Sequence, residues 1–333
     1  MKHVTKLILA GLVATGTLSA VKLDVAQAEE LSLAYFMGPK HPMNNGLMTP
    51  FGEKLAELSD GRLTVKQFPG GALNGAPPKQ YAILLDGVAD IVFTLPGYTA
   101  DVFPKTNVVG LPGVCNSAVE CTEALQRARD DLEKEYNAKV IALWANAPPV
   151  LITKDKPVTK LSDLEGMKVR VTSKGDVPFV EALGASAITQ PVNVINQNLA
   201  NGVIDAIMID PSAIGSFKLY EPANYVTTWF PGSGSSFALL MNKELYDGLS
   251  DEDKAAVDAA ASAELALGAG KAYDAVAGKG LSAAEKNNVQ LLEWDPGERE
   301  KVQAAIDAAM VDIGQTMVGD AKVADVMKKM MGQ

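Results

Sequence analysis

Residues 161–171 read LSDLEGMKVRV, a polar turn followed by a short apolar strand that carries Arg170 near its end. A guanidinium buried there needs an anionic partner, because burying an unpaired charge is strongly unfavourable. An internal carboxylate would make Arg170 part of a structural salt bridge, the ordinary explanation for an arginine in a strand. A ligand carboxylate would make it a binding residue, since the planar guanidinium holds carboxylates through two parallel hydrogen bonds. Ligands of α/β sheets bind beyond the carboxyl ends of the strands, where Arg170 would lie.

Short apolar strands alternate with helices on both sides of this segment. Strands are predicted at residues 31–36, 63–68, 91–95, 140–144, 150–153, 169–171, 204–209 and 237–241. Helical spacing covers residues 117–135, where Ser117 and Glu120 form a capping box. From Ser250 to about Asn287 an alanine-rich, charged stretch predicts one long helix. This alternation predicts an α/β fold with largely parallel sheets.

The first 28 residues have the pattern of an export signal. Lys2 and Lys6 precede an apolar stretch at residues 7–21, and Ala26-Gln27-Ala28 has the small-x-small pattern of a cleavage site. We therefore expect a signal peptide at 1–28 and a soluble exported protein. Its 305 remaining residues of 333 predict two lobes, because single cores stop growing at roughly 250–300 residues.

The composition excludes several classes of function. The signal carries Lys2, Lys6, Lys22 and Asp24, a net charge of +2, so its removal takes the net charge from −10 to −12. Such a charge disfavours nucleic acid and anionic membranes as partners. After cleavage the chain contains one histidine, His41, and two cysteines. They cannot form the usual structural zinc site, and they exclude most histidine-based catalysis. We expect no cofactor and no metal.

Ten segments, in order and with matching spacing, resemble the DctP-type solute-binding proteins of tripartite ATP-independent periplasmic (TRAP) transporters. The most specific is residues 161–171, followed by Leu183-Gly184-Ala185. The others are Asp60-Gly61-Arg62-Leu63, Phe68-Pro69-Gly70-Gly71-Ala72-Leu73, Gly87-Val88-Ala89-Asp90-Ile91, Gly97-Tyr98, Phe103-Pro104, Leu111-Pro112, Asn201-Gly202-Val203-Ile204-Asp205-Ala206 and Leu240-Met241-Asn242-Lys243. The resemblance covers essentially the whole mature chain.

The resemblance implies a fold and a function. The fold has two α/β lobes joined by crossing strands and a long helix, with the ligand in the cleft between them. We place the first lobe at 29–152 plus about 238–280, and the second at 153–237 plus about 281–333. The function is to capture a small organic carboxylate in the periplasm, to close around it and to deliver it to TRAP permease subunits in the membrane. The family's arginine in this segment binds the ligand carboxylate, which assigns that role to Arg170. We expect a monomer.

Two departures from the family pattern change which ligand is expected. One branch reads Asp-Gly-x-x-x-Pro-Trp-Glu where this chain reads DAIMIDPS at 205–212, so the expected aromatic lid and carboxylate are altered. Other branches carry a second binding arginine near 148–152, where this chain reads PPVL at 148–151. One cleft arginine favours a monocarboxylate over a dicarboxylate. A dicarboxylate could still use Lys40, Asn45 or backbone amides.

Seven further residues are expected around Arg170, each with a plainer alternative. They are Phe36, His41 and Tyr98 from the first lobe, and Met208, Asp210, Trp229 and Phe237 from the second. Phe36, Met208 and Phe237 could belong to the core, and Trp229 could pack beneath the turn at 231–232. Asp210 could bind a ligand hydroxyl, an amine or a cation, or it could cap the helix that follows.

Two further hypotheses concern chemistry. An enzyme is the rival function: a lyase that acts on a small organic acid with Asp210 and Tyr98. It requires two titratable groups with opposed pKa shifts in one pocket, and no motif indicates them. Cys115 and Cys121 are expected to form a disulfide, because Cys115 lies just outside the helix that Ser117 caps, Cys121 lies in its first turns, and exported proteins are oxidised. The alternative is two buried thiols.

Overall fold

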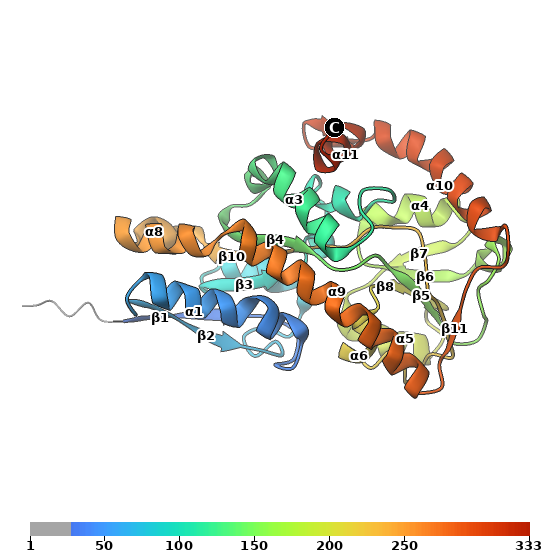
Figure 1. Ribbon diagram of the computed structural model, residues 1–333, viewed down its shortest axis with the longest axis horizontal. Coiled ribbons are helices and arrows are strands. Elements are labelled where there is room, and N and C mark those ends of the chain that lie inside the picture. Colours follow the sequence, from blue (N-terminus) through green and yellow to red (C-terminus); the bar gives the residue numbers. More distant parts are fainter. Residues whose placement is uncertain (1–27) are drawn as a thin grey trace, which may run out of the picture.

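The computed structural model describes residues 28–333 and contains two mixed β-sheets bridged by a long helix (Figure 1). The predicted signal peptide, except Ala28, lies outside the described residues. The first sheet has the strand order β2-β1-β3-β10-β4. Its strands are β1 (Glu29–Ala34), β2 (Leu63–Phe68), β3 (Ile91–Thr94), β4 (Ala138–Ala145) and β10 (Ser236–Asn242).

The second sheet has the strand order β11-β9-β5-β8-β6-β7. Its strands are β5 (Val150–Thr153), β6 (Lys168–Val171), β7 (Ser186–Thr189), β8 (Ala206–Ile209), β9 (Tyr225–Thr227) and β11 (Gln290–Leu292). A small ribbon pairs β12 (Met317–Val318) with β13 (Ala321–Lys322). The α/β class is confirmed, although β5 and β10 run antiparallel to their neighbours. These two strands enter directly from the other lobe and therefore run in the opposite direction.

Helices cover the sheets and fill the connections between strands. They are α1 (Thr49–Leu58), α2 (Gln80–Leu85), α3 (Ala118–Leu132), α4 (Val177–Ala182), α5 (Val192–Ala200), α6 (Ser212–Ser216), α7 (Lys243–Gly248), α8 (Asp251–Ala260), α9 (Ala263–Lys286), α10 (Glu298–Gln315) and α11 (Val323–Met331). The alanine-rich stretch is two helices rather than one. Ser250 caps α8, and Ser262 begins α9 by accepting a hydrogen bond from the Leu265 N–H. A second N-capping serine is thus the reason for the break.

Helix α9 packs against both lobes, on α3 of the first and α6 of the second (Figure 1). Two of its glycines make these contacts possible. A Cβ on Gly270 would lie 2.7 Å from Thr122 Oγ1, and one on Gly280 would lie 1.8 Å from the Pro211 carbonyl oxygen. Glycine costs about 1 kcal/mol relative to alanine in a helix. Here it allows the helix to approach each lobe closely.

The chain crosses between the sheets at residues 146–149 and again at 228–235. Strand β5 lies in the second sheet, so the first crossing comes a few residues earlier than predicted. The two crossings are joined to each other. Asn146 N–H donates to the Ser235 carbonyl at 3.2 Å, and Ser235 N–H donates to Asn146 Oδ1 at 2.7 Å.

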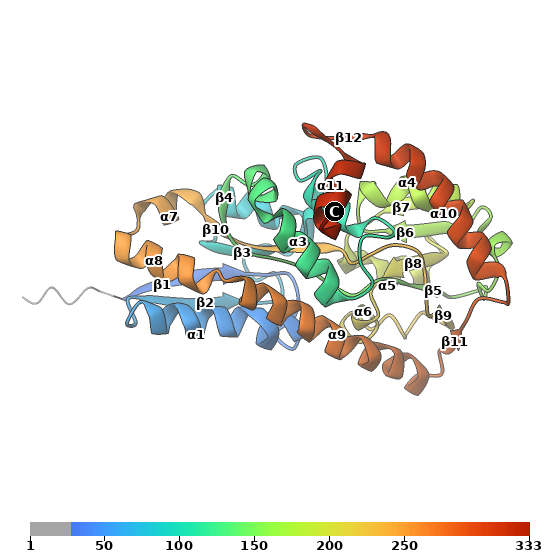
Figure 2. The same cartoon turned by 45° about the horizontal axis from the view of Figure 1, so that its top comes forward.

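The C-terminal segment divides between the lobes, although the sequence places all of it in the second. Helix α10 packs on α4 of the second lobe, whereas α11 packs on α3 of the first, and Figure 2 shows this return. Cys115 and Cys121 are joined by a disulfide with Cα atoms 5.1 Å apart, at the start of α3. Among residues 28–333, no helix combines the length and hydrophobicity needed to cross a bilayer.

Candidate ligand-binding site

Arg170 is the next-to-last residue of β6 and its side chain is buried, at 1% exposure. Its Nε and Nη2 donate to the Gln190 carbonyl at 2.9 and 2.7 Å, and Nη1 donates to Thr172 Oγ1 at 3.0 Å. The ion pairs of arginines in the described chain involve Arg62, Arg127 and Arg129 and not Arg170. The guanidinium is therefore held in place by neutral oxygens, which orient it but do not neutralise its charge.

The guanidinium faces a cavity that lies between the two lobes, which we call the inner cavity. The first lobe contributes residues that follow β1 and residues of β3 and β10, and the second lobe contributes Arg170 and residues at or just after the ends of β6 and β8. The carboxyl ends of β6 and β8 thus meet the cavity, as expected for an α/β sheet.

Seven aromatic rings line the inner cavity and form a continuous series, which we call the aromatic wall. Neighbouring ring centroids are 5.2 to 6.3 Å apart. In order along the wall, the residues are Tyr98, Phe36, Phe93, Phe237, Tyr273, His41 and Phe217. Tyr98, the first ring of the wall, lies near Arg170. Burial raises the pKa of its hydroxyl, and the Arg170 charge opposes that shift.

A buried acid, Asp210, also lines the inner cavity. Its Oδ1 accepts hydrogen bonds from the Ser212 N–H and hydroxyl, and its Oδ2 accepts one from Asn146 Nδ2 at 2.8 Å. Burial raises the pKa of this carboxyl, and the hydrogen bonds oppose the shift. Asp210 therefore caps the turn into α6, as one of the two predictions has it, and it also lines the cavity, where its contact with a ligand stays a prediction.

His41 and Tyr273 contribute two further polar atoms to the cavity. His41 Nδ1 accepts the Met43 N–H at 3.3 Å, and burial lowers the pKa of the imidazole to about 4. The ring is therefore neutral near pH 7 and carries its proton on Nε2, where it can donate. Tyr273 is 2% exposed, and its hydroxyl makes no hydrogen bond within the described chain.

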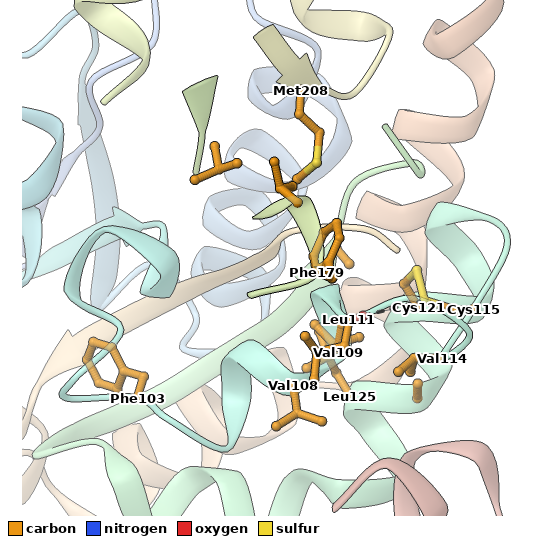
Figure 3. Close-up of a cluster of buried hydrophobic side chains, with 14 of the residues drawn as sticks. Phe103, Val108, Val109, Leu111, Val114, Cys115, Cys121, Leu125, Phe179 and Met208 are labelled. Atoms are coloured by element: carbon orange, nitrogen blue, oxygen red, sulfur yellow. Dashed lines mark hydrogen bonds between the residues drawn. A yellow bond between two sulfur atoms is a disulfide. The ribbon is translucent and has the colours of Figure 1, made fainter. Parts of the chain in front are cut away.

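Six of the eight residues predicted for the site line the inner cavity. They are Arg170, Asp210, Tyr98, Phe36, His41 and Phe237. Phe237 was predicted in the second lobe, but it lies in β10 and therefore belongs to the first. The side chain of Met208 does not line it but points toward Phe179 in a hydrophobic cluster (Figure 3). Only the backbone of Met208 reaches the site, through its carbonyl 3.4 Å from Arg170 Nη1. Side chains alternate along β8, so a strand that ends at the site aims only every second one toward it.

Trp229 does not line the inner cavity, so its predicted place in the site is wrong. Its ring lies 4.4 Å from the Arg299 guanidinium and 6.2 Å from the Trp294 ring, beside the start of α10. Its carbonyl accepts a hydrogen bond from Trp294 Nε1. Residues just after a strand can turn to either side of the sheet, and the sequence pattern of β9 does not specify the side.

Several residues of the cavity are not predicted by the sequence patterns. The most consequential are Phe93, Asn146, Phe217 and Tyr273. Tyr273 could have been singled out from the sequence, since it is the one aromatic residue in α9, a helix otherwise rich in alanine and glycine. Asn146 carried another, because it is a polar residue directly after the buried strand β4.

The two lobes touch across the inner cavity. The Tyr98 hydroxyl accepts the Val192 N–H at 3.0 Å, which joins the first lobe to α5 of the second. At the surface, Lys174 pairs with Asp101 at 2.5 Å. These two contacts connect the lobes on the side of the inner cavity where Tyr98 lies.

Comparisons with known proteins agree with this architecture. The family model described as bacterial extracellular solute-binding protein, family 7 (DctP) matches residues 33–315. A solved TRAP solute-binding protein from a marine metagenome, specific for aromatic acid ligands and bound to 3-hydroxybenzoate, is 29% identical. It covers 92% of this chain and 98% of its own, with a TM-score of 0.85. A surface mutant of that protein bound to metahydroxyphenylacetate is 30% identical, with a TM-score of 0.83 and coverage of 91% and 97%.

Two curated relatives have other functions by name. The outer membrane transporter protein TsaT of Comamonas testosteroni is 27% identical over 272 residues, which are 80% of this chain and 79% of TsaT. The ectoine/5-hydroxyectoine-binding periplasmic protein UehA of Ruegeria pomeroyi is 28% identical over 254 residues, 74% of this chain and 71% of UehA. Ligands therefore differ among similar proteins, and the specificity of this chain has to be argued from its own cavity.

Proposed function

The chain belongs to the bacterial extracellular solute-binding proteins of family 7, the DctP proteins of TRAP transporters, and we propose that it binds an aromatic monocarboxylate in the periplasm and delivers it to TRAP permease subunits. The observation that carries the proposal is the buried Arg170 guanidinium, which neutral oxygens orient and no described carboxylate pairs. A ligand carboxylate would supply the missing charge through bidentate hydrogen bonds.

The charges around the inner cavity favour one carboxylate over two. Arg170 is the one cationic side chain among the residues that line it, and Asp210 would repel a second anion. Lys40, considered from the sequence for a dicarboxylate, lines a neighbouring outer cavity together with Lys279. Asn45 lines neither cavity.

The aromatic wall favours a ring over an aliphatic chain. Aromatic side chains gain about 0.5–1.5 kcal/mol from stacked or edge-to-face pairing beyond the burial of their area. Six phenylalanine and tyrosine rings around one small cavity offer such contacts on several sides. The metagenomic neighbour specific for aromatic acids supports the same ligand class.

Binding without catalysis is the better reading of the titratable groups. A lyase would need an acid and a base whose pKa values are shifted in opposite directions. Asp210 and Tyr98 both have their pKa values raised by burial. The Tyr98 hydroxyl is also occupied by the Val192 N–H. The remaining parts of the proposal are export through a cleaved signal peptide at 1–28 and a monomeric protein.

The first test is native mass spectrometry of the protein purified from its expression host, followed by calorimetry with benzoate, 3-hydroxybenzoate and succinate. We expect a retained small acid, tighter binding of the benzoates than of succinate, and no turnover of the bound acid by NMR. Small-angle scattering should show a smaller radius of gyration with ligand, since binding favours the closed state. Tight binding of succinate without binding of either benzoate would refute the ligand class, and turnover would refute the binding role.

A further inference from the structure

Three polar groups of the inner cavity are not used in holding a carboxylate on Arg170. They are the Tyr273 hydroxyl, His41 Nε2–H and Asp210 Oδ2. Tyr273 connects the other two. Its ring lies edge-on to His41 with centroids 6.3 Å apart, and the Asp210 charge contributes to raising the pKa of its hydroxyl. We call these three groups the hydroxyl subsite.

Each group of the subsite has unused hydrogen-bonding capacity. A carboxylate has about four acceptor positions. Asp210 uses three of them, two on Oδ1 for Ser212 and one on Oδ2 for Asn146. His41 Nε2–H can donate, because Nδ1 already accepts the Met43 N–H. The Tyr273 hydroxyl can donate and accept, and it has no partner in the described chain although the residue is 2% exposed.

The chemistry of these groups selects among possible ligand substituents. An apolar substituent would leave buried donors and acceptors unpaired, which is costly. A second carboxylate would face the Asp210 charge. An ammonium group could donate to Asp210 but could not accept from His41 Nε2–H. A hydroxyl group can do both, since it carries one donor and two acceptor positions.

We therefore infer that the ligand is a hydroxy-substituted aromatic monocarboxylate, whose carboxylate binds Arg170 and whose hydroxyl donates to Asp210 and accepts from His41 or Tyr273. This inference rests on the proposed function and names the substituent that distinguishes this ligand within its class. Among the three residues of the subsite, Tyr273 allows the cleanest substitution. Replacing it with Phe keeps the ring stacked on Phe237 and removes a hydroxyl that no internal hydrogen bond uses.

The test compares affinities for benzoate and for 2-, 3- and 4-hydroxybenzoate in wild type, Tyr273→Phe and Asp210→Asn by calorimetry. At least one hydroxy isomer should bind wild type more tightly than benzoate. For that isomer, the affinity ratio over benzoate should fall about 3- to 10-fold in Tyr273→Phe, as expected for one neutral hydrogen bond. In Asp210→Asn the ratio should fall about 10- to 100-fold, because that hydrogen bond is charge-assisted.

Two controls make the result decisive. Tyr246→Phe removes the hydroxyl that donates to Asp258 at the surface and should leave the ratio unchanged. The methoxy analogue of the preferred isomer, which cannot donate, should bind no better than benzoate. Absence of any preference for a hydroxy isomer, or a preference that survives in both variants, would overturn the hydroxyl subsite and leave the aromatic-acid proposal intact. Tighter binding of 3-(aminomethyl)benzoate than of every hydroxy isomer would overturn it in favour of a cation. Failure of wild type to bind any benzoate would instead refute the proposed function.

Discussion

The two lobes contribute different chemistry to the inner cavity. The first lobe supplies most of the aromatic wall, whose rings Phe93, Phe237 and Tyr273 are members of that lobe's hydrophobic core. The second lobe supplies the charges, Arg170 and Asp210. One face of the site is therefore built from residues that also hold the protein folded, and the other from polar groups whose burial opposes folding. Substitutions on the first face should affect stability and binding together, and those on the second should affect mainly binding.

Arg170→Ala should have the largest effect, and it tests the second-lobe face of the site. The lost pair would be desolvated in a closed cleft, so affinity for 3-hydroxybenzoate should fall by about 2–5 kcal/mol, or roughly 30- to 5,000-fold. Unfolding free energy should change less than affinity, because removal of the buried charge offsets the loss of its hydrogen bonds to Gln190 and Thr172. Calorimetry and urea unfolding measure the two quantities. Arg170→Lys should recover part of the affinity, and Arg127→Ala, on the surface of α3, should change neither the affinity nor the cavity. Unchanged affinity in Arg170→Ala would return Arg170 to a structural role.

Gly280→Ala tests the helix that holds the two faces together. Its Cβ would lie 1.8 Å from the Pro211 carbonyl oxygen, next to Asp210, and such overpacking typically costs about 1–3 kcal/mol. Gly278→Ala is the matched control, because a Cβ there has nothing within 4 Å and should gain up to about 1 kcal/mol from helix propensity. Thermal unfolding should therefore move in opposite directions for the two variants. A rise in the unfolding temperature of both variants would mean that α9 does not need its close approach to the second lobe.

Phe237→Leu tests the first-lobe face of the site. Phe237 stacks on Trp144 and Tyr273 with ring centroids 5.7 and 5.5 Å away. Removing its ring should reduce the preference for benzoate over cyclohexanecarboxylate about 2- to 10-fold, and it should also lower the unfolding free energy by about 1 kcal/mol, on the scale of one aromatic pair. Competition binding and urea unfolding report the two effects. A loss of stability without a loss of preference would show that the wall is core only.

Asp101→Asn should have the smallest effect. It removes the exposed ion pair with Lys174 that spans the lobes, and such pairs contribute at most about 1 kcal/mol. We expect affinity to fall no more than about 5-fold, and we expect this loss to come from faster dissociation of the ligand. Stopped-flow fluorescence at low and high salt measures this, and the difference from wild type should shrink as salt screens the pair. A larger effect that persists at high salt would mean that Asp101 acts on the ligand or the hinge instead.

Local patterns were enough to predict where Arg170 lies in the fold. Arg170 could be placed at the end of a buried strand because strand length, the preceding turn and the charge are all local features. The same local information misplaced Trp229 and the Met208 side chain. Both lie in or just after a strand of the second sheet, where a shift of one residue or a turn to the other side changes which face a side chain occupies.

The amino-acid sequence by itself determined the α/β class, the two lobes, the family and the position of Arg170 near the end of a buried strand, because these follow from periodicity, caps, turns and one distinctive segment. Only the tertiary structure decided that Tyr273 meets Arg170 and Asp210 in one cavity. Tyr273 is about a hundred residues from Arg170 along the chain, and its place on α9 depends on glycine contacts with both lobes. Helical spacing indicates that such a residue is buried, but the partner it is buried against is set by the packing of distant segments.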